Sequence, residues 1–227
     1  GNAFAALKDD GSVVVWAAPG WVADGSADVS SVSSYLSSGV KDIFTTYRAF
    51  AALKKDGSVV TWGHSDYGGD SSSINHLIRS NVSKVFASNQ AFAVIKDDGS
   101  VVTWGKAIYD DNWRDGQTGN IYSIDGQSSN NNLIIFADIE NQLKSDVIDI
   151  VSSSDAFAAL KSDGSVITWG SKSSGGDSSQ VKNQLINGVK KIYATSNAFA
   201  VLKEDGSVIA WGENGWGGDI THLSTEL

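Results

Sequence analysis

The chain contains no cysteine, which excludes disulfide bonds and thiolate-bound metal sites. It contains no methionine either, even at position 1, so we expect a processed or excised piece of a larger protein. Its single proline, Pro19, contrasts with 24 glycines, a balance that is typical of short strands joined by many turns. No apolar run approaches the roughly 20 residues that a membrane-spanning helix needs, so the sequence predicts no membrane insertion.

Basic residues are also few, since 17 Lys and Arg stand against 26 Asp and Glu and the formal net charge is -9. The lysines are scattered singly and form no basic patch of the kind that binds phosphate groups. A nucleic-acid partner is therefore not expected, and an anionic membrane surface is disfavoured for the same reason.

One phrase, "AFAALKKDGSVVTWG" at residues 49–63, recurs in four other close copies. Its phenylalanine lies at positions 4, 50, 92, 157 and 199, which indicates a base period of about 42 residues. We expect a single repeat domain over 1–227, with units at about 1–39, 40–81, 82–146, 147–188 and 189–227. The third unit carries an insertion at about 107–136.

The sequence of each unit predicts three short antiparallel strands and a helical turn. In the last unit, "VKKIYATSN" alternates apolar and polar residues, while "AFAVLK" and "SVIAWG" are rich in β-branched and aromatic residues. Between the latter two, Asp followed by Gly favours a tight hairpin turn, because glycine takes the positive φ that closes it. The turn glycines of the five copies are Gly11, Gly57, Gly99, Gly164 and Gly206.

The helical turn is expected after the sequence Gly-Gly-Asp-Ser-Ser of the second and fourth units. Asp70 and Asp177 are suitable N-caps there, and Gly188 is a suitable C-cap. Apolar residues three or four apart follow the two aspartates, as on one face of a helix. They are Ile74, Leu77 and Ile78 in the second unit, and Val181 and Leu185 in the fourth.

Small or apolar residues occupy both faces of the predicted strands, so each sheet must be covered on both sides. Stacking the units in a ring or in a row provides this cover. The predicted fold is therefore a mainly β, β-propeller-like repeat protein, with an open β-solenoid as the alternative. The Trp near the end of each hairpin is predicted to fill the gap between stacked units rather than to form a ligand platform. These residues are Trp16, Trp62, Trp104, Trp169 and Trp211.

The stretch "VKKIYATSNAFAVLKEDGSVIAWGENGWGGD" at 189–219 resembles the repeat of the regulator of chromosome condensation family. All five copies keep the Asp-Gly turn and the Trp, so the resemblance covers nearly the whole chain. Alanine stands where the family commonly has histidine before the small-residue strand, and Gly-Gly-Asp replaces Gly-Gln-Leu-Gly, which marks a divergent, pseudo form of the repeat. The resemblance implies a β-propeller. Chromatin binding and nucleotide exchange do not carry over, because no basic face and no exchange motif are present.

Aromatic residues outside the repeated positions are candidates for ligand contacts. Tyr67 and Trp216 stand just before Gly-Gly-Asp, where the fourth unit has Ser174, and Trp21 lies among the extra residues of the first unit. A serine at this position predicts an exposed loop, and exposed loops carry many binding residues.

The insertion of the third unit holds the leading candidates, Trp113 and Arg114, whose residue types are enriched in binding hot spots. Tyr109 and Tyr122 lie in the same segment and are candidates as well. Insertions in repeat proteins often lie on the binding face. The alternative is a loop that contacts no ligand.

No catalytic residue, metal ion or cofactor is predicted. The three histidines, His64, His76 and His222, have no nucleophile or metal-ligand motif beside them. The Asp-Gly turns lack the spacing and the final Glu of a calcium-binding loop.

These observations favour a non-catalytic binding or recognition module within a larger protein, with a protein or carbohydrate partner. An extracellular or cell-surface location is favoured over a cytoplasmic one. The alternatives are a structural spacer or assembly unit without a ligand, and an enzyme, which would need convergent polar groups in one pocket.

Overall fold

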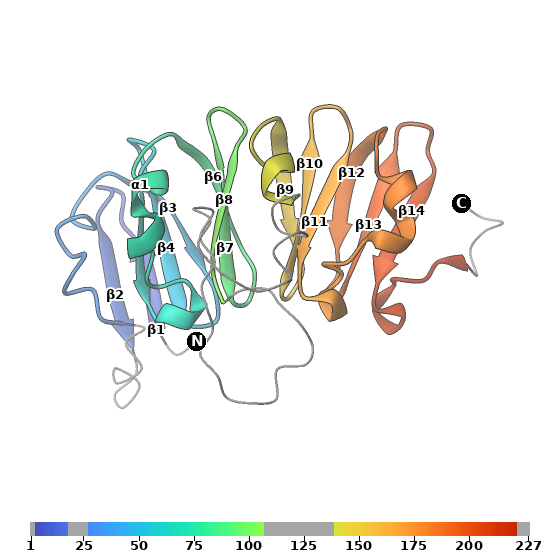
Figure 1. The fold of residues 1–227 in the computed structure, drawn as a ribbon. Coiled ribbons are helices and arrows are strands. Elements are labelled where there is room, and N and C mark those ends of the chain that lie inside the picture. Colours follow the sequence, from blue (N-terminus) through green and yellow to red (C-terminus); the bar gives the residue numbers. More distant parts are fainter. Residues whose placement is uncertain (1–2, 18–26, 107–138, 222–227) are drawn as a thin grey trace. The chain divides into compact units, whose positions relative to one another are not determined.

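The computed structural model describes residues 3–17, 27–106 and 139–221, which form five antiparallel sheets and several short helices (Figure 1). The first sheet has two strands and the other four have three each. The chain divides into two compact units: the first contains the three sheets up to Gly105, and the second contains the two sheets from Val147 onwards. The predicted mainly β repeat fold is confirmed.

Every three-stranded sheet has the same strand order. In the first unit, the two-stranded sheet of β1 (Ala3–Leu7) and β2 (Val13–Ala17) is followed by β3 (Val40–Thr45), β4 (Ala49–Lys54), β5 (Val59–Gly63), β6 (Val82–Ala87), β7 (Ala91–Lys96) and β8 (Val101–Gly105). The second unit contains β9 (Val147–Ser152), β10 (Ala156–Lys161), β11 (Val166–Gly170), β12 (Val189–Ala194), β13 (Ala198–Lys203) and β14 (Val208–Gly212). The strand that opens each repeat, here called the linking strand, pairs with the middle strand, which pairs with the last.

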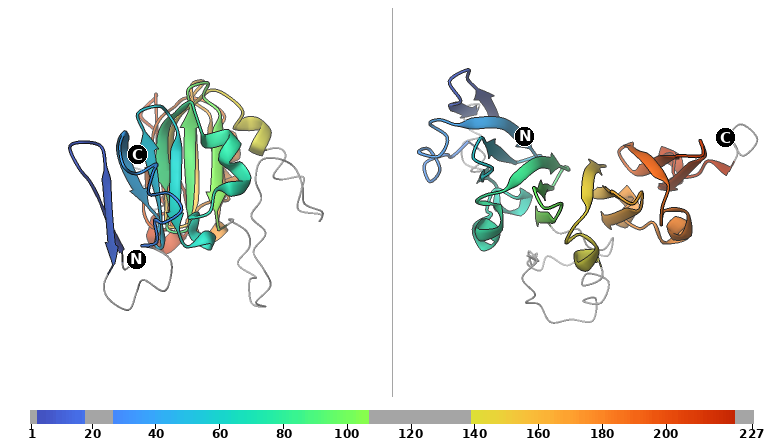
Figure 2. Two further views of the ribbon diagram at one scale, coloured as in Figure 1. Left: turned by 90° about the vertical axis from the view of Figure 1, so that its left-hand side faces the viewer. Right: turned by 90° about the horizontal axis from the view of Figure 1, so that it is seen from above.

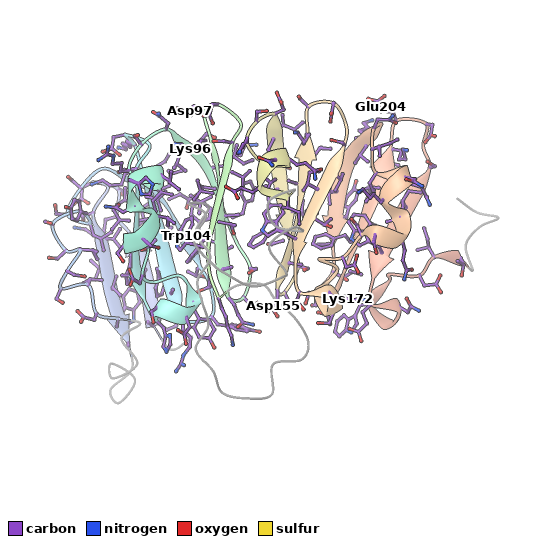
Figure 3. The ribbon with its side chains drawn as sticks, in the orientation of Figure 1. Lys96, Asp97, Trp104, Asp155, Lys172 and Glu204 are labelled. Atoms are coloured by element: carbon purple, nitrogen blue, oxygen red, sulfur yellow. The ribbon has the colours of Figure 1, made fainter. Side chains whose placement is uncertain are left out.

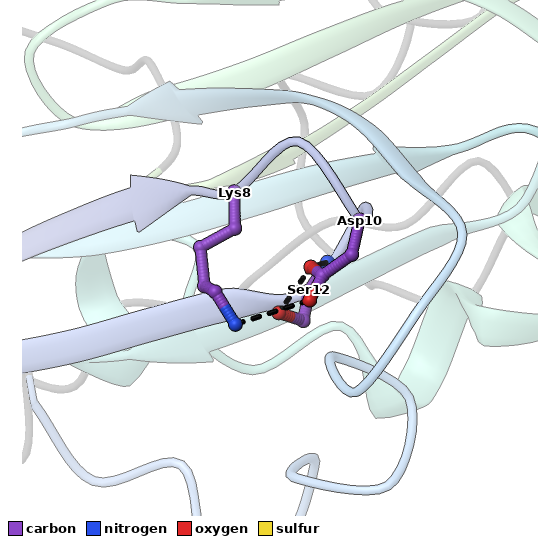
Figure 4. A network of polar contacts seen from close by, with 3 residues as sticks. All are labelled: Lys8, Asp10 and Ser12. Atoms are coloured by element: carbon purple, nitrogen blue, oxygen red, sulfur yellow. Dashed lines mark hydrogen bonds and ion pairs between the residues drawn. The ribbon is translucent and has the colours of Figure 1, made fainter.

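The Asp-Gly turns of the first, second, fourth and fifth repeats close by the same two backbone hydrogen bonds. In the first repeat, the Gly11 N–H donates to the Lys8 carbonyl and the Lys8 N–H to the Ser12 carbonyl, both at 2.9 Å. This is a three-residue loop that ends in a left-handed glycine. All five turn glycines have φ between 77° and 88°, as predicted. Figure 4 shows that the Asp10 carboxylate also accepts from the Ser12 hydroxyl at 2.6 Å and from Lys8 Nζ at 3.1 Å.

We expect these turn carboxylates to make the stability of the protein depend on pH below about 4. The hydroxyl and N–H of Ser12, followed by Lys8, lower the pKa of Asp10 from 3.8 to about 2. The matching serines lower the pKa of Asp56, Asp163 and Asp205. Because the folded pKa is the lower one, the stabilisation is complete above pH 3.8 and is lost as the pH falls through the folded pKa.

The measurement is the thermal unfolding midpoint against pH for the parent and for a variant with Asn at these four positions. Asn keeps an acceptor oxygen but carries no charge, so the variant should melt lower at pH 7 and approach the parent towards pH 2. A difference that does not change with pH would contradict the expectation.

Both faces of the middle strands β4, β7 and β10 are buried, as the sequence predicts. All of Ala49–Leu53 in β4 is buried, and one face of this strand packs with Ala3 and Ala5 of the preceding sheet. The opposite face packs with Phe92 of the following sheet. The sheet of β4 is therefore covered on both faces by its neighbours within the first unit. In the second unit, the face of β10 that carries Ala156 and Ala158 packs with Phe199 of β13.

The loop after the second hairpin fits the aromatic pair of the third repeat. Phe92 and Trp104 stack with ring centroids 5.4 Å apart, and Trp104 Nε1 donates to the Gly68 carbonyl at 3.0 Å. A Cβ on Gly68 would lie only 2.7 Å from Phe92 Cδ2, so the loop has room for glycine alone. We call this loop the glycine seat; it comprises residues 67–69, 174–176 and 216–218 of the second, fourth and fifth repeats.

The same contact recurs in the second unit. Trp211 Nε1 donates to the Gly175 carbonyl at 2.9 Å, and a Cβ on Gly175 would lie 2.7 Å from Phe199 Cδ2. The seat of the fourth repeat therefore also requires glycine, because Phe199 of the fifth repeat occupies the space that a side chain would need.

Four of the five repeated tryptophans are buried: Trp62, Trp104, Trp169 and Trp211. The expectation of a buried wedge does not hold for Trp16, which is 48% exposed. Its ring stacks on Phe4 of the same hairpin, and the face that other repeats turn towards a preceding sheet is uncovered in the described part of the chain.

The helical turn of the second repeat consists of the 3-10 turn η3 (Ser72–Ile74) and the helix α1 (Asn75–Ile78). Ile74 and Ile78 are buried in the core, and α1 lies beside the sheets (Figures 1 and 2). Asp70 accepts the Ser72 N–H at 2.9 Å, but the N-cap residue of η3 is Ser71. The N-cap therefore lies one residue after the predicted Asp70. In the fourth repeat, Asp177 likewise accepts the Ser179 N–H, and the N-cap is Ser178.

The fourth repeat corrects a second expectation. Its helix is the 3-10 helix η5 (Ser179–Gln184), which ends with Leu185 as its C-cap. Gly188, expected as the C-cap, has φ 71° and leads directly into β12 instead. Three further 3-10 turns are η2 (Ser65–Tyr67), η4 (Lys172–Ser174) and η6 (Asn214–Trp216). Within the residues described, no helix is long and apolar enough to cross a bilayer.

Candidate functional site

Each sheet has two ends that differ in character. One end carries the Asp-Gly turn, which Lys96 and Asp97 mark in Figure 3 for the sheet of Trp104. The other end combines the turn after the linking strand with the residues after Trp-Gly, and we call it the variable edge. Asp155 and Lys172 in Figure 3 belong to the variable edge of the fourth repeat.

One backbone hydrogen bond builds the variable edge in every three-stranded repeat. The residue after Trp-Gly donates its N–H to the carbonyl of the residue before the middle strand, at 2.8–2.9 Å. The donors are His64, Lys106, Ser171 and Glu213, and the acceptors are Arg48, Gln90, Asp155 and Asn197. The backbone is thus constant, while the side chains displayed on it change from repeat to repeat.

In the second repeat this edge carries a cluster of Tyr67, Arg48 and His64. The Arg48 guanidinium lies over the Tyr67 ring at 5.8 Å from its centroid, and the His64 ring meets Tyr67 edge-on at 5.4 Å. The Thr46 hydroxyl donates to the Tyr67 carbonyl at 3.0 Å, and His64 Nδ1 accepts the Asp66 N–H at 3.3 Å. These bonds hold the backbone of Tyr67 and the imidazole of His64 at this edge.

Tyr47 precedes Arg48 and adds a largely exposed ring to this edge. Sequence reasoning missed both Tyr47 and Arg48. The available signal was their irregularity, because the same two positions hold Asn-Gln, Ser-Asp and Ser-Asn in the third, fourth and fifth repeats. An aromatic and an arginine at positions that are otherwise small or polar indicate a role beyond the scaffold.

Ser174 is buried at 3% exposure, so the reason for expecting an exposed loop at this position is wrong in the fourth repeat. Its carbonyl accepts from the Ser153 hydroxyl at 2.7 Å, and its own hydroxyl donates to Asn197 of the next repeat at 3.4 Å. Tyr67 is partly buried against the core of its unit, whereas Trp216 is 49% exposed. The position is therefore covered where another repeat follows closely.

The remaining predicted site residues, Trp21, Tyr109, Trp113, Arg114 and Tyr122, lie outside the described residues. The insertion follows Lys106, whose N–H makes the variable-edge bond of the third repeat. In the sequence, it therefore begins one residue after the position that matches His64 of the second repeat.

In a chain without cysteine, a metal site would draw on His, Asp and Glu, and the described side chains include all three types. No group of three or more His, Asp and Glu that could hold a metal ion occurs among them. His64 caps η2, His76 lies in α1, and His222 falls outside the described residues.

No protein-family model matches the chain, and no curated protein matches it in sequence. Solved structures do match. The ectodomain of the Physcomitrella patens receptor kinase CR4 is 15% identical, with a TM-score of 0.51 over 93% of this chain and 51% of that one. Human WBSCR16 is also 15% identical, with a TM-score of 0.51 over 95% and 61% of the two chains.

Prp20p, the RCC1 protein of Saccharomyces cerevisiae, is 17% identical over 77% of this chain and 44% of that one, with a TM-score of 0.49. The chain spans between 44% and 61% of the length of these three proteins. The two matches with TM-scores of 0.51 support the β-propeller-like repeat fold that the sequence predicts. At these identities the likeness concerns the fold alone.

Proposed function

We propose that the chain is a non-catalytic protein-binding module whose contact surface includes the variable edge of the second repeat. The cluster of Tyr47, Arg48, His64 and Tyr67 carries this proposal, because it combines fixed aromatic rings with a cation on an outer edge. Trp, Tyr and Arg dominate the energetics of protein interfaces, and rings that are already ordered lose little entropy on binding.

The residues that recur in every repeat and those that vary between repeats have different roles, and this difference supports the same function. Residues that recur in all five repeats serve the scaffold: the glycines turn the hairpins, and the Phe-Trp pairs stack within them. The side chains of the variable edge differ between repeats although its backbone bond does not. Specificity for one partner requires this kind of irregular display on a rigid frame. We further propose that this module is extracellular or displayed at the cell surface.

The test uses the biotinylated chain as a probe on arrays of purified proteins and of glycans. We expect a protein hit whose apparent affinity falls at least about tenfold in the variant Tyr47→Ala/Arg48→Ala/Tyr67→Ser. Serine is chosen for position 67 because Ser174 fills that position in the fourth repeat. Tyr193→Ala, which removes an exposed ring on β12, is the matched control and should bind like the parent.

Two results would count against the proposal. One is a protein hit that binds the triple variant and the parent equally well. The other is binding to glycans alone, which would replace the protein partner by a carbohydrate.

A further inference from the structure

The sequence contains two Asn-Gly pairs, Asn187-Gly188 and Asn214-Gly215. The first lies between the helix η5 and the strand β12, at the junction of the fourth and fifth repeats. The junctions before β3, β6 and β9 have a serine at the position that matches Asn187, namely Ser38, Ser80 and Ser145. Asparagine is therefore irregular at a place that the scaffold otherwise fills with serine.

Both reacting groups of the Asn187-Gly188 pair lack hydrogen bonds. Asn187 is exposed and lies in a bend outside any helix or strand, and Gly188 has φ 71°. Within the residues that the structure describes, neither the Asn187 side-chain amide nor the Gly188 N–H has a hydrogen-bond partner. Glycine also has no side chain to shield its nitrogen, and its backbone rotates more freely than that of other residues. No existing interaction therefore has to break before these two groups meet.

The chemistry of such a pair is an intramolecular attack by the glycine nitrogen. The Gly188 nitrogen loses its proton to solvent and forms a bond to Asn187 Cγ, and the side-chain amide nitrogen leaves as ammonia. Water then opens the five-membered succinimide ring at one of its two carbonyl carbons, which gives aspartate or isoaspartate. Water is the only co-reactant, and the reacting atoms are already neighbours in the chain, which favours ring closure.

Asn214-Gly215 has the same two residues in a different backbone conformation. Asn214 begins the 3-10 turn η6, and its carbonyl accepts the Gly217 N–H at 3.2 Å. The ψ angle in a 3-10 turn is about -20 to -30°, and closing the succinimide ring requires a different ψ at the asparagine. Asn214 can therefore react only after η6 opens, whereas Asn187 has no such constraint.

We propose that Asn187 is a site of spontaneous deamidation, and that its isoaspartate product loosens the junction of the fourth and fifth repeats. Two backbone hydrogen bonds hold this junction. The Gly188 carbonyl accepts the N–H of Glu204, which Figure 3 labels, at 2.8 Å. The N–H of Val189, a buried residue, donates to the Gly164 carbonyl at 3.0 Å.

Isoaspartate places the Cβ of residue 187 in the main chain, so the path from η5 to β12 becomes one atom longer. The added atom displaces the Gly188 carbonyl and the Val189 N–H from acceptors and donors whose positions are fixed by the neighbouring hairpins. Deamidation also adds one negative charge to a chain that is already acidic. This modification is independent of the second-repeat cluster proposed above to bind a partner.

The experiment incubates the purified full chain for several weeks in mildly alkaline buffer, which favours loss of the glycine N–H proton. Peptide mass spectrometry follows the conversion of amide into acid at each asparagine, and enzymatic methylation of isoaspartyl groups measures the isoaspartate. Asn187→Ser is the matched control, because serine fills this position at the other junctions and cannot form the ring. It also gives the background from the Asp-Gly turns. A synthetic peptide of residues 184–192 gives the rate without the fold.

We expect Asn187 to convert at least about tenfold faster than Asn214. The aged parent should unfold at a lower urea concentration than the fresh parent, while aged and fresh Asn187→Ser should unfold alike. Equal rates at the two asparagines would overturn the site, as would an unchanged Asn187 in the chain while the free peptide converts. An aged parent that contains isoaspartate at position 187 but keeps its urea midpoint would overturn the loosening of the junction.

Discussion

Replacing Trp104 with alanine is expected to lower the free energy of unfolding by about 3–5 kcal/mol. The side chain is 3% exposed and stacks on Phe92, and its Nε1 is the donor for the Gly68 carbonyl. Truncation leaves a cavity between two sheets of the first unit and removes the hydrogen-bond donor of a buried carbonyl. The loss therefore combines packing and hydrogen bonding at the contact that joins successive repeats.

Trp16→Ala is the matched control, because it removes the same residue from the same strand position of an exposed hairpin. It should cost less than about 1 kcal/mol, as surface substitutions do. The measurement is urea denaturation followed by far-UV circular dichroism at low protein concentration. If the two substitutions proved equally costly, the glycine-seat contact would not be a main source of stability.

Gly175→Ala is expected to destabilise the second unit by about 2–5 kcal/mol, from two separate causes. Its φ of 87° lies in the left-handed region, which an L-residue enters at a cost of about 1–2 kcal/mol. The added Cβ would also lie 2.7 Å from Phe199 Cδ2, and Phe199 is buried and cannot move away freely. Overpacking of this kind costs about 1–3 kcal/mol more.

Gly217→Ala separates the two causes. Its φ of 96° imposes a similar backbone cost, but its Cβ would meet no atom within 4 Å. The unfolding midpoint in urea should therefore fall less for Gly217→Ala than for Gly175→Ala, by an amount that reports the clash alone. Equal shifts would mean that only backbone strain matters at these positions.

The variable edge could be predicted only in part, because its construction depends on residues far apart in sequence. The sequence directed attention to Tyr67 and Trp216 through their place beside Gly-Gly-Asp. It did not point to Arg48, which precedes Tyr67 by nineteen residues and lies over its ring only once β3, β4 and β5 have paired. Ser174 shows the converse, since a polar residue at a loop position became buried beneath the next repeat.

The sequence by itself determined the repeat, the three strands, the Asp-Gly turns and the burial of both faces of β4, β7 and β10. These features follow from local chemistry, because a positive φ at Gly11 or the alternation in "VKKIYATSN" involves neighbours along the chain. Only the tertiary structure decided why the residue after Tyr67 must be glycine, and why Trp16 differs from its four counterparts. Both depend on whether another repeat packs against the residue, and a periodic sequence shows the same motif whether its neighbour is present or not.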